Sequence, residues 1–143
     1  MNLKKFELII FDLDGTLVDS AKDIMIANNK TLEKFGYKPI SFKDVKHIIG
    51  QGIRVNIIRS LKMQNVKINK KKENEMYDFF FSFYKKNLYV KSKIYGGLNS
   101  FLKNLKKQGY KLAVCSNKLE ALTKIVLKKT KLLKYFDFVA CLL

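Results

Sequence analysis

The alternation of apolar and polar residues divides the chain into strand-like and helix-like segments, beginning with a short apolar run. This run, Leu8-Ile9-Ile10-Phe11, stops before the turn signal Asp14-Gly15. A short apolar run rich in β-branched residues and bounded by a turn is typical of a strand that is buried on both faces of a sheet. We therefore predict a buried first strand that carries Asp12 to its carboxyl end, where open α/β sheets bind their ligands.

A helical pattern begins at Asp19, because apolar residues then recur at intervals of three or four. The interruptions of this pattern predict four helices. The first ends at Gly36, and the second covers Phe42–Ile49 with Ser41 as its N-cap. The third carries Val55, Ile58 and Leu61 on one face, and the fourth runs from about Glu73 to Leu88. We expect the basic run Lys70-Lys71-Lys72 to be a solvated turn. The aromatic residues of the last helix are expected to belong to the core.

The strand-like pattern resumes near Lys91. The expected elements are an amphipathic helix with Leu98, Phe101, Leu102 and Leu105, a strand over Lys111–Cys115, a helix over Leu119–Leu133 and a strand over Phe138–Leu143. Strands that alternate with helices indicate an α/β fold with a parallel sheet. Residues of about 18 to 90 would then form a helical insert between two strand-bearing segments.

The length and composition favour a small globular protein. A chain of 143 residues allows one ordinary domain, or a core with a small insert. A hydrophobic fraction of 48% permits a packed core, and 13% aromatic residues argue against disorder. The sequence has no long apolar run that would span a membrane, and Met1 to Lys5 is too short for a signal peptide. We therefore expect a cytoplasmic protein, in which Cys115 and Cys141 are reduced and buried.

The net charge of +17 comes almost entirely from lysine, since Arg54 and Arg59 are the only arginines. A strongly basic chain is a candidate for binding nucleic acid or an anionic surface. However, arginine is the side chain that reads bases and clamps phosphate groups with two hydrogen bonds. Its scarcity favours a solvated basic surface that attracts small anionic substrates, and nucleic-acid binding remains a third alternative.

Two carboxylates, Asp12 and Asp14, stand two positions apart at the predicted strand end. Such close carboxylates repel each other, and a hard cation such as Mg²⁺ relieves the repulsion. One carboxylate can attack phosphorus while the second passes a proton to the leaving oxygen. The alternative is an ordinary Asp-Gly turn in which Asp14 serves only the turn.

The full string DLDGTLVDS, placed after an apolar strand, resembles the first motif of the haloacid dehalogenase superfamily of aspartyl-phosphate phosphatases. Ser116-Asn117-Lys118 follows the second predicted strand and resembles the second motif of that superfamily. Taken without the first motif, Ser116 and Asn117 would be an ordinary helix N-cap. Gly50-Gln51-Gly52, followed by Ile53 and Arg54, is similar to the cap loop that closes over substrate in phosphoglycolate phosphatases and their close relatives. The structural alternative there is a turn between helices with an exposed arginine.

The resemblance implies a fold, an activity and a set of site residues. The fold would be a Rossmann-like parallel sheet formed by residues 1–17 and 91–143, with residues 18–90 as a helical cap. The activity would be Mg²⁺-dependent hydrolysis of a small phosphomonoester, with 2-phosphoglycolate as the expected substrate. Asp12 would be the nucleophile and Asp14 the general acid and then the base, with Mg²⁺ on the Asp12 carboxylate and the Asp14 backbone carbonyl. The residues expected to bind substrate or its phosphate are Gly15, Thr16, Ser116, Asn117, Gly52 and Arg54.

Two further motifs of the superfamily are absent from this sequence: the third-motif lysine and the acidic fourth motif. Lys118, Lys131 and Lys134 precede the expected position of the third motif, and none of them is assigned that role. We expect a truncated chain in which the first strand, central in relatives, becomes a sheet edge open to self-association. The alternative function is therefore a catalytically impaired remnant, or one half of a split enzyme, that acts only by binding.

Overall fold

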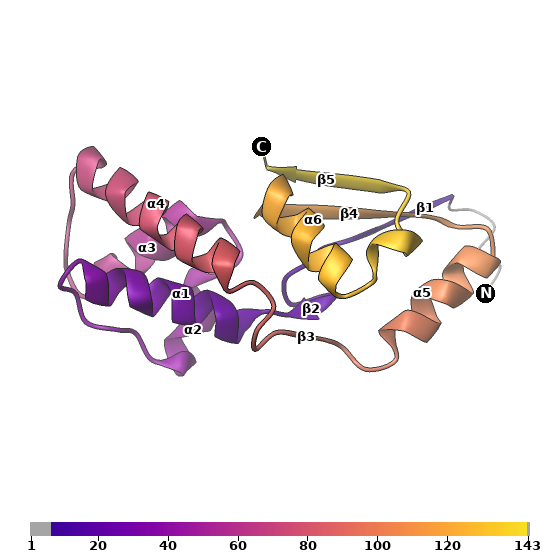
Figure 1. Ribbon diagram of the computed structural model, residues 1–143, viewed down its shortest axis with the longest axis horizontal. Helices are drawn as coiled ribbons and strands as arrows, with labels where there is room; N and C mark the ends of the chain where they lie inside the picture. Colours follow the sequence, from indigo (N-terminus) through magenta and orange to yellow (C-terminus); the bar gives the residue numbers. More distant parts are fainter. Residues whose placement is uncertain (1–6, 143) are drawn as a thin grey trace. The chain divides into compact units, whose positions relative to one another are not determined.

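The computed structural model describes residues 7–142, which form two compact units (Figure 1). The core unit comprises the described parts of Met1–Asp19 and Lys93–Leu143, and the helical unit is Ser20–Ser92. The core unit holds a parallel sheet with helices, as the α/β prediction requires, and the helical unit holds four helices.

The sheet of the core unit has three parallel strands in the order β1-β4-β5. They are β1 (Leu8–Phe11), β4 (Lys111–Leu119) and β5 (Phe138–Leu142). A second, antiparallel pair joins β2 (Val18–Asp19) to β3 (Lys93–Ile94), so the segments that leave and re-enter the core unit are hydrogen-bonded to each other. The strand predicted over Lys111–Cys115 is longer than expected and runs on to Leu119. The predicted end of the last strand, Leu143, lies outside the described residues.

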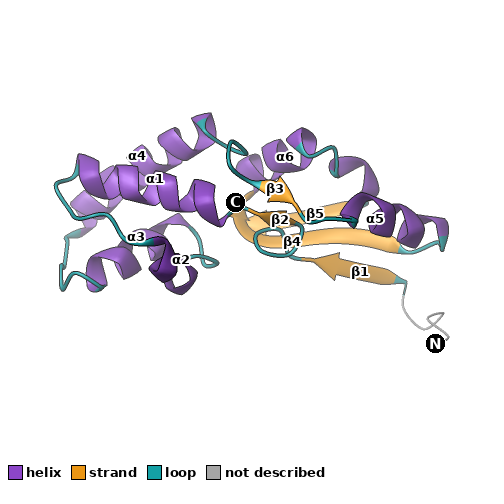
Figure 2. Cartoon of the chain, turned by 90° about the horizontal axis from the view of Figure 1, so that it is seen from below, coloured by secondary structure: helices purple, strands orange, loops and turns teal. Residues whose placement is uncertain are grey.

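Helices of the core unit pack on one face of the sheet (Figure 2). They are α5 (Leu98–Lys107), α6 (Glu120–Lys129) and the short 3₁₀ helix η2 (Leu133–Tyr135), so the predicted helix over Leu119–Leu133 is shorter and is followed by a separate turn. The Phe11 ring lies edge-on to Phe101 of α5 and to Phe136 after η2, with centroids 6.4 and 6.0 Å away. Its register partner Val114 is fully buried beneath these helices.

The opposite face of the sheet is open in the described structure. Leu8, Ile10 and Phe138 are 44%, 61% and 59% exposed, and Cys115 is also exposed. We call these four residues the open sheet face. The prediction that β1 is buried on both faces is therefore wrong, because no helix of the described residues covers this side. The prediction that β1 is a sheet edge is confirmed, since β1 is the terminal strand of the described sheet. The prediction that both cysteines are buried is wrong, because Cys115 is exposed and Cys141 is only partly buried; neither cysteine forms a disulfide.

The helical unit consists of α1 (Ala21–Lys34), α2 (Phe42–Ile48), α3 (Ile53–Lys62) and α4 (Lys70–Lys86). Its apolar core includes six side chains that are at most 5% exposed: Ile24, Leu32, Ile57, Leu61, Met76 and Phe80. The basic run expected to be a turn is instead the first turn of α4, because Asn69 caps this helix by accepting a hydrogen bond from the Lys72 backbone N–H at 2.9 Å.

The buried face of α3 also differs from the prediction. Ile58 is 40% exposed, whereas Ser60 is fully buried. Ser60 accepts a hydrogen bond from the Asn28 side chain at 2.9 Å and donates to the Asn56 backbone carbonyl at 2.8 Å. Polar side chains that are satisfied internally can occupy a buried helix face, and apolar spacing alone does not identify them. No helix among residues 7–142 is both long enough and apolar enough to cross a membrane.

Candidate active site

The candidate active site is built on the loop that follows β1. The Leu13 backbone carbonyl accepts hydrogen bonds from the N–H groups of Thr16, Leu17 and Val18, at 3.3, 2.9 and 3.0 Å. The side chains of Leu13 and Leu17 are completely buried. Gly15, at φ +83°, closes the loop by donating from its N–H to the Val18 carbonyl at 2.8 Å. The loop is therefore fixed by two buried leucines and a compact set of backbone hydrogen bonds.

Asp12 and Asp14 lie on either side of the buried Leu13, which holds both of them at one end of β1. Asp12 is exposed, and its Oδ1 accepts a hydrogen bond from the Leu13 N–H at 2.8 Å. This hydrogen bond orients the Asp12 carboxylate while leaving the side chain accessible. The arrangement suits a group that must meet an incoming electrophile.

Asp14 forms an ion pair with Lys118 of β4. Lys118 Nζ lies 3.1 Å from Asp14 Oδ2, and the two side chains are 6% and 19% exposed. A buried ammonium group is tolerated only when it is paired, because its desolvation is otherwise very costly. The pair joins the carboxyl ends of β1 and β4, which are neighbouring parallel strands.

Ser116 and Lys118 lie in an irregular stretch of β4. The register steps from Ser116 opposite Cys141 to Leu119 opposite Leu142, so Asn117 and Lys118 interrupt the regular pairing with β5. Such irregularities re-aim side chains and are frequent next to active sites. Ser116 is 8% exposed, and its Oγ accepts a hydrogen bond from the Lys118 backbone N–H at 3.1 Å.

The interpretation of Ser116 as an ordinary helix N-cap is wrong. Helix α6 begins at Glu120, its N-cap is Leu119, and no side chain caps it. Pairing with β5 keeps the chain extended through Ser116, and the helix starts only after this pairing ends. Asn117, the other residue of the second motif, is exposed.

The remaining residues expected from the sequence are divided between the two units. Gly15 and Thr16 are exposed in the loop after β1. Gly52 is the N-cap of α3, with φ +91°, and Arg54 lies in the first turn of that helix. The structure thus brings Asp12, Asp14, Gly15, Thr16, Ser116 and Asn117 into one region of the core unit, and it places Gly52 and Arg54 in the helical unit.

Arg54 is bound within the helical unit. Its Nη1 donates to Glu73 Oε1 at 3.0 Å and to Asn74 Oδ1 at 2.9 Å, and its guanidinium lies 4.3 Å from the centroid of the Tyr77 ring. The hydrogen bond from Lys70, with a smaller contribution from Arg54, holds the pKa of Glu73 below its usual range. Arg54 is therefore oriented by α4.

A magnesium ion would be held by few protein groups. No cluster of three or more His, Cys, Asp or Glu side chains occurs within residues 7–142. Mg²⁺ is nevertheless commonly bound by one or two carboxylates together with water and substrate phosphate. Because the Asp14 carboxylate contacts Lys118, the exposed Asp12 carboxylate is the better placed ligand. The residues present fit a magnesium ion that is bound partly through the substrate.

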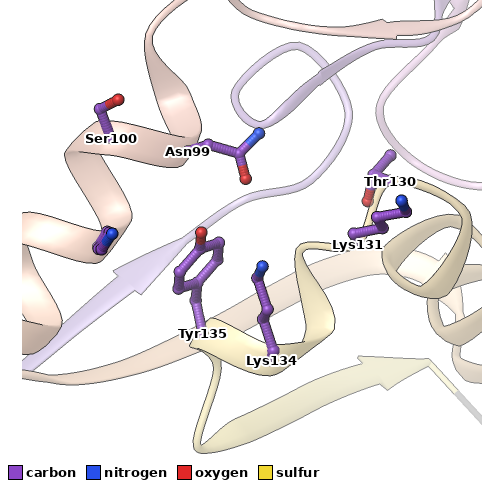
Figure 3. A pocket seen from close by; sticks show the side chains of 7 residues that line it. Asn99, Ser100, Thr130, Lys131, Lys134 and Tyr135 are labelled. Atoms are coloured by element: carbon purple, nitrogen blue, oxygen red, sulfur yellow. The ribbon is translucent and has the colours of Figure 1, made fainter.

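A separate surface pocket of about 420 Å³ lies between α5 and the segment after α6 (Figure 3). It is lined by Asn99, Ser100, Lys103, Thr130, Lys131, Lys134 and Tyr135. The pocket contains no carboxylate and none of the residues predicted from the sequence. Without a carboxylate, this pocket lacks both the nucleophile and the proton donor that the sequence predicts. The loop after β1 is the better candidate for catalysis.

Comparison with known proteins agrees with this geometry. The family model described as haloacid dehalogenase-like hydrolase matches residues 9–143. The chain belongs to the haloacid dehalogenase-like hydrolases. The resemblance drawn from the DLDGTLVDS string is therefore confirmed at the level of the family.

Individual haloacid dehalogenase-like relatives are considerably longer than this chain. It is 37% identical over 134 residues to the phosphoglycolate phosphatase of Agrobacterium fabrum, and 41% identical over 132 residues to that of Aquifex aeolicus. These matches cover 94% and 92% of this chain but only 58% and 59% of the relatives. The chain thus spans less than two thirds of the length of the curated relatives that it matches.

Solved structures of haloacid dehalogenase-like proteins have the same fold. The crystal structure of a predicted phosphoglycolate phosphatase from Haemophilus somnus matches with a TM-score of 0.89 and 29% identity, over 97% of this chain and 64% of that one. A predicted phosphatase from Clostridium acetobutylicum matches with a TM-score of 0.74 and 26% identity, over 95% of this chain and 61% of that one. These structures support the α/β fold described above.

Lys118 is a site residue for which no role was predicted from the sequence. Its position directly after Ser116-Asn117 was the available signal, together with its place at the end of an apolar strand. The contact with Asp14 depends on the parallel pairing of β1 with β4, which brings together residues that are distant in the sequence.

Proposed function

We propose that this chain contributes the catalytic loop of a Mg²⁺-dependent phosphomonoester hydrolase that acts through an aspartyl-phosphate intermediate, with 2-phosphoglycolate as its substrate. The observation that carries the proposal is the pair of carboxylates, Asp12 and Asp14, held on either side of the buried Leu13 at the end of β1. The names of the relatives from Agrobacterium and Aquifex support the choice of substrate. A small phosphorylated metabolite as substrate also fits a cytoplasmic location.

The proposed reaction has two steps. In the first, a carboxylate oxygen of Asp12 attacks phosphorus, the bond from phosphorus to the substrate oxygen breaks, and Asp14 gives a proton to the leaving oxygen. In the second, water attacks phosphorus, Asp14 takes a proton from the water, and the bond between Asp12 and phosphorus breaks. The products are the alcohol and inorganic phosphate, and both carboxyl groups return to their starting states.

The neighbouring residues bind and neutralise the phosphoryl group. The Ser116 hydroxyl, Asn117 and the Thr16 hydroxyl are proposed to donate hydrogen bonds to its oxygens. Gly15, whose N–H donates to the Val18 carbonyl, is proposed to let the phosphoryl group approach closely because it has no side chain. A bound Mg²⁺ would neutralise negative charge on the phosphoryl group. Catalysis of this kind depends mainly on positioning and on electrostatic stabilisation. A loop fixed by buried leucines is suited to both.

Gly52 and Arg54 are also proposed to bind the substrate. The guanidinium of Arg54 matches a carboxylate in shape and charge, and 2-phosphoglycolate carries one. Because Arg54 already donates to Glu73 and Asn74, binding of a carboxylate would add to these hydrogen bonds or replace them.

Binding without turnover is a second candidate function. It is favoured by the open edge of β1 in the described sheet. Nucleic-acid binding has less support, because both arginines have partners within the helical unit: Arg59 donates to Gln51 Oε1 at 2.7 Å and to the His47 carbonyl at 3.3 Å.

The test is the release of inorganic phosphate from 2-phosphoglycolate and from p-nitrophenyl phosphate, with and without Mg²⁺. Turnover that requires Mg²⁺ and is lost in Asp12→Asn would support the enzyme. Saturable phosphate binding without turnover would support the binding function. Retention on DNA that decreases steeply with salt, in the absence of both, would favour nucleic acid.

A further inference from the structure

Lys118 differs from every other lysine in the described part of the chain. It is the only buried lysine among residues 7–142, although lysines are abundant on the surface of both units. Its ammonium group lies 3.1 Å from Asp14 Oδ2, and the Lys118 side chain is only 6% exposed. The ammonium group of a surface lysine remains hydrated because its side chain extends into solvent. A buried lysine therefore indicates a specific partner for its charge.

The backbone of Lys118 also contacts Ser116, one of the residues proposed to bind phosphate at the end of β4. Its N–H donates to Ser116 Oγ at 3.1 Å. Because the Ser116 oxygen accepts this hydrogen bond, the hydroxyl hydrogen can be directed to another acceptor, such as a phosphoryl oxygen. Lys118 therefore contacts both Asp14, the proposed proton donor, and Ser116, a proposed phosphate-binding residue.

We propose that Lys118 is a positioning residue for Asp14, an inference that rests on the proposed phosphatase function. The ammonium group holds Oδ2 and thereby turns Oδ1 toward the oxygen that gains or loses a proton. This arrangement serves both steps, since the Oδ2 of a protonated carboxyl group still accepts a hydrogen bond when the proton is on Oδ1. Lys118 itself need not touch the substrate.

The test compares Lys118→Met, which keeps a similar length without charge, with Lys118→Arg, which keeps the charge. The matched control is Lys111→Met, because Lys111 lies on the same strand and pairs with Asp137 at 3.8 Å, away from the proposed reaction. A misplaced catalytic group commonly lowers the rate by about 10²-fold. We therefore expect kcat to fall by roughly 10- to 100-fold in Lys118→Met, with KM changed by less than about twofold and with partial recovery in Lys118→Arg.

An unchanged kcat in a folded Lys118→Met protein would overturn the proposal, as would an equal loss in the Lys111→Met control. If the wild-type chain shows no turnover, the phosphatase proposal fails and the positioning role is decided by ¹³C NMR of the Asp14 carboxyl group. A resonance that moves and broadens in Lys118→Met, but not in Lys111→Met, would show that Lys118 orients Asp14. An unaltered resonance would overturn the inference. If Lys118→Met does not fold, the same comparison is made with Lys118→Arg, in which a displaced resonance is expected.

Discussion

Asp23 and Ser92 join the two ends of the helical unit. Asp23 lies in the first turn of α1 and is 4% exposed, and its Oδ2 accepts hydrogen bonds from both the hydroxyl and the N–H of Ser92, the latter at 2.9 Å. The same carboxylate accepts the N–H groups of Val90 and Lys91, at 3.0 and 2.8 Å. One buried side chain therefore satisfies three successive backbone donors where the chain leaves the unit.

This arrangement predicts that Asp23→Asn destabilises the helical unit. An amide oxygen accepts more weakly than a carboxylate, and the amide hydrogens would face donors. Leaving buried donors poorly satisfied costs on the order of 1–3 kcal/mol. Urea denaturation followed by far-ultraviolet circular dichroism would measure the loss. Asp78→Asn, on the exposed part of α4, is the control, and equal stability of the two variants would contradict the prediction.

The proposed nucleophile gives a second prediction. Asp12→Asn is expected to abolish turnover of any phosphomonoester, because an amide cannot form the acyl phosphate. Asp14→Asn is expected to impair both protonation of the leaving group and activation of water. Steady-state phosphate release at saturating Mg²⁺ measures both variants. A rate above about a tenth of wild type in Asp12→Asn would remove Asp12 as the nucleophile.

Much of the fold and part of this site were predictable from local sequence. The apolar run before Asp12 identifies β1, and the DLDGT string identifies the two carboxylates, because both signals are contained within a few consecutive residues. The burial of β1 was mispredicted, since it depends on which strands and helices flank β1 in space. The partner of Asp14 was not predictable for the same reason: it is supplied by a strand about a hundred residues away.

Other differences have a local physical cause. The polar triplet Ser116-Asn117-Lys118 has the composition of a strand end, but pairing with β5 keeps the chain extended to Leu119. The buried hydrogen bond between Asn28 and Ser60 likewise makes a polar helix face part of the core. In both cases a tertiary hydrogen-bonding partner, which the sequence pattern does not reveal, outweighs the local preference.

Arg54 gives a third prediction, for substrate recognition. If it binds the carboxylate of 2-phosphoglycolate, Arg54→Ala should lower kcat/KM for that substrate more than for p-nitrophenyl phosphate, by a difference of about 2 kcal/mol. The matched control is Arg59→Ala, since Arg59 lies on the same helix and also donates to partners within the helical unit. Equal losses on both substrates would argue for a structural role through Glu73 and Asn74 instead.

Asp137 gives a prediction for pH dependence. The hydrogen bond from Lys106, followed by that from the Leu112 backbone N–H, lowers the pKa of Asp137 below its usual range. A carboxyl group whose pKa is lower in the folded state stabilises the fold above the pKa of the unfolded state, which is about 4. That contribution is lost as the pH falls further, through the folded-state pKa.

The stability of the wild-type chain should therefore decrease below about pH 4 more steeply than that of Asp137→Asn. Thermal denaturation between neutral and acidic pH would measure the two profiles. Glu120→Gln is a suitable control, because Glu120 pairs with Lys124 on the surface of α6. Parallel profiles for wild type and Asp137→Asn would show that the Lys106 contact does not contribute to stability.

The last prediction concerns self-association through β1. The strand has an unpaired edge in the described sheet, and its side chains Leu8 and Ile10 are 44% and 61% exposed. Phe138 extends the same apolar surface to β5 at 59% exposure. An exposed strand edge beside an apolar face favours pairing with another chain. We propose that a second copy of this chain is the partner, because each copy offers the same edge and the same open sheet face.

Ile10→Lys should reduce this association, because a lysine beside an open strand edge opposes pairing and places charge on the face that a second copy would cover. The matched control is Ile58→Lys, since Ile58 is a 40% exposed isoleucine of the helical unit. Light scattering over a range of protein concentrations would give the mass of each variant. We expect wild type and Ile58→Lys to associate as concentration rises, and Ile10→Lys to remain monomeric over a wider range. A wild-type chain that is monodisperse at every concentration would contradict the prediction, as would association that Ile10→Lys leaves unchanged.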